Sequence, residues 1–156
     1  MNIFFLDKDP NKAVQMLCDC HVVKMTLETA QLFCTYFRRN GFTNNDLYKS
    51  THINHPCQKC LNNFSNIIWL AYYFKAILNE YTYRYGKIHK CQYIFDKYVK
   101  PLIENNIKIP YNDLTFPKCM PDEYKVDSVI QSYINYYGFK KKSLKRFKFT
   151  KRKEWI

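Results

Sequence analysis

The segment Cys20–Phe33, CHVVKMTLETAQLF, combines the spacing of an apolar helix with four polar side chains. At about 100° per residue, Glu28 lies only roughly 20° around the helix from His21, because seven residues nearly complete two turns. Lys24 and Gln31 fall slightly farther round, so the four form one polar stripe beside the apolar face. A half-buried carboxylate next to a lysine or a histidine can have a shifted pKa, as catalytic carboxylates do. Spacing alone favours a simpler interpretation, an ordinary ion pair between Lys24 and Glu28 on a helix surface.

The elements that must position this stripe are predicted to be helices. Apolar periodicity, with Asp9-Pro10 as a start signal and glycines as stops, predicts helices over residues 10–39, 65–85, 89–105 and 121–138. The second is apolar nearly all round and is therefore expected to be the central one. Pro56 should begin a short helical turn, and Pro101 should bend or end the third helix. The predicted fold class is mainly α, a single compact helical domain with a short extended N-terminal segment.

Charge is concentrated at the C-terminal end of the chain. The formal net charge is +12 over 156 residues, and residues 139–156 hold nine Lys/Arg against one acidic residue. Four aromatic residues are interleaved with these cations, and rings can stack on bases while cations bind phosphates. We therefore predict a helical domain over residues 1–138 and a basic aromatic segment over 139–156. The expected partner is nucleic acid rather than a membrane surface.

Cysteine usage indicates reduced thiols. Seven cysteines are an odd number, and neither a secretory leader nor a membrane span is recognisable, so a monomer in a reducing cytoplasmic or nuclear compartment is expected. His55, Cys57 and Cys60 could form half of a zinc site, with His89 and Cys91 as the remainder. The second half lacks paired ligand spacing, so buried thiols are favoured and no metal or cofactor is predicted. Neither HExxH nor a phosphate-binding glycine loop occurs, which excludes metalloproteases and P-loop NTPases.

Several motifs, in a common order, resemble those of the pyrimidine dimer DNA glycosylases, the family of phage endonuclease V. They are NIFFL (2–6), HVVKMTLETAQLF (21–33), NHP (54–56), EYTYRYGK (80–87) and SYINYYGFK (132–140). The chain is also similar to proteins of phages and giant viruses, which points to a viral protein. The resemblance implies a repair-type glycosylase with AP lyase activity that acts on a damaged or modified base in double-stranded DNA.

The resemblance also implies a mechanism. In that family a helix carries a histidine and, seven residues later, the catalytic glutamate, which correspond here to His21 and Glu28. The nucleophile is the terminal α-amine, whose ordinary pKa of about 7.7–8.0 leaves part of it unprotonated near neutral pH. An ungapped match places Met1 at the nucleophile position, and Asn2 would take its place if Met1 were removed. The family's arginine just before the glutamate is Leu27 here.

The family's second arginine, three residues after the glutamate, is also lost, and this reduces the clamping of phosphates. The residues predicted to contact nucleic acid are Asn2, Lys24, Gln31, Asn54, His55, Arg84, Lys87, Tyr137, Lys140, Lys141, Lys142, Lys145 and Arg146. Two other functions stay open at this stage. One is a non-catalytic nucleic-acid-binding protein on the same scaffold, and the other is a viral nucleotide-binding or nucleotide-hydrolysing protein.

Overall fold

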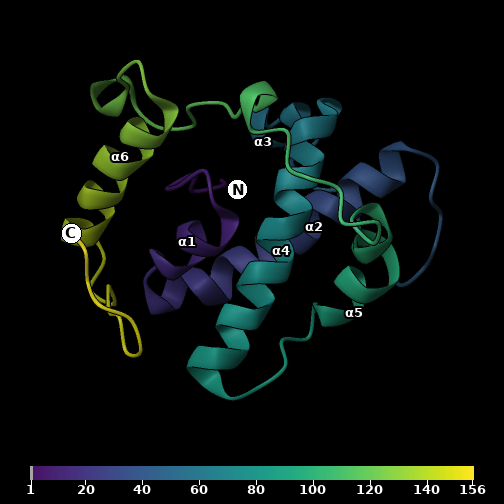
Figure 1. Cartoon of the computed structure of the whole chain (residues 1–156), viewed down its shortest axis with the longest axis horizontal. Helices are drawn as coiled ribbons and strands as arrows, with labels where there is room; N and C mark the ends of the chain where they lie inside the picture. Colours follow the sequence, from purple (N-terminus) through teal and green to yellow (C-terminus); the bar gives the residue numbers. More distant parts are fainter. Residues whose placement is uncertain (1) are drawn as a thin grey trace.

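A long helix, α4 (Phe64–Tyr85), runs through the middle of the computed structural model, which describes residues 2–156 (Figure 1). The Asn63 side chain caps its first turn by accepting the Ser65 N–H at 2.8 Å. Gly86 ends it in the left-handed region, with φ at 64°, which glycine adopts without steric cost. Trp69, Tyr73 and Phe74 of α4 are fully buried. The predicted central helix over 65–85 is confirmed.

The N-terminal helical region is divided into α1 (Pro10–Gln15) and α2 (Asp19–Arg39), which both pack against α4. The prediction of one helix over 10–39 is wrong. Cys18 is extended, with φ −69° and ψ 162°, and separates the two. Carbonyls freed by the break accept hydrogen bonds from Arg84 and Trp155, each at 2.7 Å. These donors come from distant parts of the chain, so tertiary contacts override the local preference for a continuous helix.

Short helical elements connect the long helices. His55 caps α3 (Pro56–Lys59), which confirms the helical turn predicted at Pro56 and continues into a 3₁₀ turn, Cys60–Asn62. After α4 comes α5 (Gln92–Ile94). It continues through a π-helical turn, Phe95–Val99, and a 3₁₀ turn, Lys100–Leu102, so the predicted third helix exists but is shorter. Two more 3₁₀ turns, Tyr111–Asp113 and Asp122–Tyr124, lie before the last helix.

The last helix, α6, spans Val129–Ser143 rather than the predicted residues 121–138. It begins where the Ser128 hydroxyl accepts the Gln131 N–H at 3.2 Å, and not at the preceding proline. Gly138 lies inside the helix, and only one side-chain atom, from Ile156, would approach a Cβ there. Glycine ends a helix only when the chain needs a left-handed residue at that point. The helix therefore continues into the basic segment.

The segment after α6 packs onto the helical body. Arg152 donates to both carboxylate oxygens of Glu80 at 2.9 and 2.7 Å, and Lys141 pairs with Glu154 at 2.6 Å. Near the opposite end of the chain, residues 3–6 are buried. No strand occurs among residues 2–156. The predicted fold class, mainly α in one compact domain, is confirmed, and its core lies around α4, α2 and the N-terminal segment.

Candidate active site

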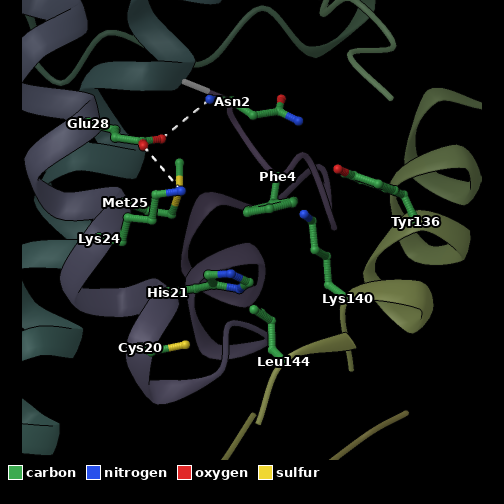
Figure 2. A pocket seen from close by; sticks show the side chains of 10 residues that line it. All are labelled: Asn2, Phe4, Cys20, His21, Lys24, Met25, Glu28, Tyr136, Lys140 and Leu144. Atoms are coloured by element: carbon green, nitrogen blue, oxygen red, sulfur yellow. Dashed lines mark hydrogen bonds and ion pairs between the residues drawn. The ribbon is translucent and has the colours of Figure 1, made fainter. Parts of the chain in front are cut away.

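The Glu28 carboxylate lies beside the N-terminal segment. Its Oε2 accepts the backbone N–H of Asn2 at 3.3 Å, and its Oε1 lies 3.5 Å from Lys24 Nζ (Figure 2). The Glu28 side chain is only 14% exposed, whereas that of Lys24 is 65% exposed. Met1, the predicted nucleophile, lies outside the described residues. The fold thus brings the second residue of the chain to the carboxylate on α2.

A pocket of about 320 Å³ opens next to this pair. Helix α2 forms one side of it, α6 the opposite side, and the N-terminal segment lies between them (Figure 2). The residues that line it are Asn2, Phe4, Cys20, His21, Lys24, Met25, Glu28, Tyr136, Lys140 and Leu144. Two cations, one carboxylate and two aromatic rings therefore share one concave site, which suits an anionic ligand that carries a flat ring.

His21 is a neutral side chain in this pocket. Burial, with smaller effects from the positive charges of Lys24 and Lys140, lowers its pKa from 6.5 to about 4. The Tyr137 hydroxyl lies 2.7 Å from His21 Nδ1 and accepts the Cys18 N–H at 2.9 Å. The hydroxyl proton also needs an acceptor, and Nδ1 lies within bonding distance, so we assign the hydroxyl proton to the bond with Nδ1. The proton of the imidazole is then on Nε2.

The Asn2 side chain is held from the side opposite Glu28. Its Nδ2 donates to the Cys119 carbonyl at 2.8 Å, and its Oδ1 accepts from the Tyr133 hydroxyl at 3.2 Å. The Tyr133 hydroxyl is also 2.7 Å from the Pro117 carbonyl oxygen. These bonds fix the start of the N-terminal segment between α2 and α6, so the 3.3 Å approach of Asn2 to the carboxylate is supported by several independent contacts.

The other predicted site residues are distributed unevenly. Lys140 joins the pocket, whereas Gln31 is half-buried farther along α2. Asn54 is exposed, and His55 is half-buried because it caps α3 by accepting the Cys57 N–H. The exposed predicted cations are Lys87, Lys142, Lys145 and Arg146. The structure therefore gathers five predicted residues of the described chain at one pocket and leaves a set of cations free at the surface.

Two predicted contact residues lie inside the fold. The Arg84 side chain is 1% exposed and donates to Glu80 at 2.7 Å and to Asp19 at 2.9 Å. Tyr137 is fully buried, and its hydroxyl is occupied by His21. Neither side chain can reach a phosphate or a base in this arrangement. We correct their predicted roles accordingly: Arg84 stabilises the break between α1 and α2, and Tyr137 holds His21 in place.

Sequence reasoning missed Phe4 and Tyr136, which are the aromatic walls of the pocket. Their ring centroids are 6.4 Å apart, and Lys140 Nζ lies 5.1 Å from the centre of the Tyr136 ring. Both residues belong to motifs that the resemblance singled out. Which of two adjacent tyrosines faces the pocket depends on the register of α6, because neighbouring helical residues point about 100° apart. The sequence therefore indicated the two motifs, but it did not show which of their side chains face the pocket.

Comparison with protein families finds a match to the model described as pyrimidine dimer DNA glycosylase, over residues 1–93. This is more than half of the chain. The protein belongs to the pyrimidine dimer DNA glycosylase family. Comparison with curated proteins and with solved structures gave no significant match. Membership assigns a DNA glycosylase-type function with DNA as the substrate.

The family match covers only some of the residues that line the pocket. It includes the N-terminal segment and α2, with Asn2, His21 and Glu28, but it stops before α6. Tyr136 and Lys140 therefore come from the part of the chain beyond the match. None of the described helices is long and apolar enough to span a membrane. The glycosylase family region thus supplies the carboxylate, and the C-terminal region completes the wall that faces it.

Proposed function

We propose that this protein is a DNA glycosylase with AP lyase activity in which a terminal amine and Glu28 act on one flipped nucleotide. The observation that carries the proposal is the 3.3 Å distance from the Asn2 nitrogen to Glu28 Oε2. An amine and a carboxylate must both reach the same sugar to share this chemistry, and Asn2, the second residue of the chain, lines the same pocket as Glu28.

The first step is attack by the unprotonated amine on C1′ of the sugar. A nitrogen–carbon bond forms, and the bond from C1′ to the damaged base breaks, so the base leaves with the bonding electrons. The nitrogen then loses a proton, the ring oxygen gains one, and opening of the sugar ring gives a Schiff base. Elimination removes a proton from C2′ and breaks the bond from C3′ to the phosphate oxygen, so the phosphate leaves with the bonding electrons, and water finally releases the enzyme. If Met1 is removed, the reacting nitrogen is that of Asn2. If Met1 is retained, its amine is one residue away from that position.

Glu28 and His21 have separate roles in the proposed reaction. The sugar gains positive charge as the base leaves, and the Glu28 carboxylate stabilises that charge and then transfers protons. His21 stays neutral at physiological pH because its pKa is about 4. With its Nδ1 held by Tyr137, it offers the Nε2 proton to an oxygen of the substrate without adding a competing positive charge. His21 therefore positions the nucleotide.

The DNA backbone is proposed to lie across the opening of the pocket between α2 and α6. Lys24 and Lys140 would neutralise phosphates next to the extruded nucleotide, and Phe4 and Tyr136 would contact its base. Lys142, Lys145 and Arg146 are exposed beyond the pocket and would extend the phosphate contact along the duplex. This arrangement supplies cations where the family's two arginines are absent from α2.

The test is borohydride trapping on a duplex that contains one abasic site, because the lyase step does not depend on the identity of the lesion. We expect a covalent protein–DNA adduct, with the modification on the N-terminal peptide when the adduct is digested and mapped by mass spectrometry. Acetylating the terminal amine, which removes its nucleophilicity, should abolish the adduct while DNA binding persists.

The mapping also provides the control. Lys24 and Lys140 line the same pocket, and a lysine amine could form a Schiff base in principle. Lys24→Arg and Lys140→Arg should keep the adduct, because each retains the charge and removes the amine. An adduct mapped to either lysine, or full trapping with a blocked terminus, would contradict the proposal. No adduct on any abasic duplex would leave only DNA binding and would also overturn it.

A further inference from the structure

Three side chains that bind soft metal ions converge behind the Asn2 side chain. A ring nitrogen of His55 and the sulfurs of Cys57 and Cys119 all lie within 4.8 Å of one another. Two of these residues are at the start of α3, and the third is 62 positions later, in the irregular segment before α6. Cys60 lies close in sequence, but its thiol points to the Cys57 carbonyl at 3.1 Å.

The sulfur spacing fits a shared metal ligand sphere. The Cys57 and Cys119 sulfurs are 3.6 Å apart. Two thiolates bound to one tetrahedral zinc ion, each with a Zn–S bond of about 2.3 Å, are separated by about 3.8 Å. A disulfide needs about 2.05 Å. The two sulfurs are therefore spaced as neighbouring ligands of a tetrahedral centre, and a ring nitrogen of His55 lies within 4.8 Å of both.

Two neighbouring side chains, those of Asn2 and Tyr133, could complete and support the metal site. Asn2 Oδ1 lies 3.7 Å from the Cys57 sulfur and can occupy the fourth position. The Tyr133 hydroxyl contacts that same oxygen at 3.2 Å and the Cys119 backbone N–H at 3.3 Å, so it orients two of the four ligands. His55 Nδ1 accepts the Cys57 N–H at 3.1 Å, and coordination would replace this single weak bond.

We propose that His55, Cys57 and Cys119 form a zinc site that ties α3 and the segment before α6 to the N-terminus. On binding, both thiols release their protons to solvent, and the two thiolates balance the charge of Zn²⁺. The site differs from the half-site expected from sequence, because Cys119 replaces both Cys60 and the His89–Cys91 pair as the completing ligand. The proposal does not depend on the glycosylase chemistry.

The test is titration of the reduced full-length protein with Co²⁺ as the spectroscopic substitute for Zn²⁺. We expect one equivalent to bind with thiolate charge-transfer and tetrahedral absorption bands that added Zn²⁺ abolishes. Cys119→Ser should weaken binding at least tenfold, whereas Cys91→Ser should leave it unchanged. Absence of the bands, or an unchanged affinity in Cys119→Ser, would overturn the proposal.

A second group of side chains that could hold a metal ion consists of Cys18, Cys20 and His21. The variant Cys20→Ser therefore distinguishes metal binding at this group from binding at the proposed site. Loss of Co²⁺ binding in Cys20→Ser with retention in Cys119→Ser would place the metal there and refute the site. If Cys119→Ser does not fold, alkylation of the unaltered protein decides the question. Cys119 and Cys20 are both half-buried, so each is compared with itself in the presence and absence of Zn²⁺. Zn²⁺ should slow alkylation of Cys119 and leave Cys20 unaffected, and equal rates at Cys119 with and without Zn²⁺ would contradict the proposal.

Discussion

Replacement of Glu28 by glutamine tests the proposed chemistry directly. Glutamine preserves the shape of the side chain and its ability to accept the Asn2 N–H, which now bonds Oε2 at 3.3 Å. It removes the negative charge that would stabilise a cationic sugar. The ion pair with Lys24 is also lost, but that lysine is 65% exposed, so the effect on stability should be small.

The size of the effect follows from the geometry. Two unit charges about 4 Å apart interact with about 4 kcal/mol at an effective dielectric constant of about 20. When Met1 is removed, a sugar bonded to the Asn2 nitrogen would be at roughly that distance from the carboxylate. Each 1.4 kcal/mol is about tenfold in rate, so complete loss corresponds to about a thousandfold. Because Glu28 is 14% exposed and glutamine retains a dipole, we expect a reduction of roughly a hundred- to a thousandfold.

The assay is single-turnover cleavage of an abasic duplex, with binding measured separately by anisotropy. Affinity should be unchanged or higher, because a negative charge near the phosphates is removed. Glu104→Gln, an exposed glutamate on the segment after α5, is the matched control and should behave as the unaltered protein. A Glu28→Gln rate within threefold of the unaltered protein would refute the role assigned to this carboxylate.

Three further predictions follow from the described contacts. His21 has a pKa of about 4 in the fold against an ordinary 6.5, so the unfolded state binds more protons between these values. The free energy of unfolding should therefore fall by up to about 3 kcal/mol as the pH drops from 7 to below 4, and urea titrations of His21→Asn should lack this part of the loss. Replacing Lys142, Lys145 and Arg146 by glutamine should reduce the log–log salt slope of duplex binding by up to about 2.7, and an unchanged slope would show that these cations do not contact DNA. Arg84→Ala should lower the free energy of unfolding by about 3 kcal/mol, because it removes the buried cation shared by Glu80 and Asp19 and the donor to the Leu17 carbonyl, while Arg152 still pairs with Glu80, and a loss below about 1 kcal/mol in urea would contradict this.

Local signals in the sequence determined most of the helices. The two ends of α4, next to Asn63 and Gly86, lie within one residue of the predicted ends. A helix cap and a left-handed glycine each act over a single turn, so a short stretch of sequence is enough to indicate them. The same kind of signal misplaced α6, since Gly138 is an ordinary helical residue there. It also missed the division between α1 and α2, because the groups that stabilise that break are on Arg84 and Trp155.

The sequence by itself determined the stripe on α2 that includes His21 and Glu28, since helical spacing places residues seven apart on one side. Only the tertiary structure decided what faces that stripe. Asn2 meets Glu28 across 26 positions, and Cys57 meets Cys119 across 62. Such contacts depend on which buried faces pack together and how the connecting loops close, and no propensity of a short segment encodes either. The residues that share one face of a helix are therefore determined by the local sequence, whereas the pocket and the proposed zinc site depend on how distant segments pack together.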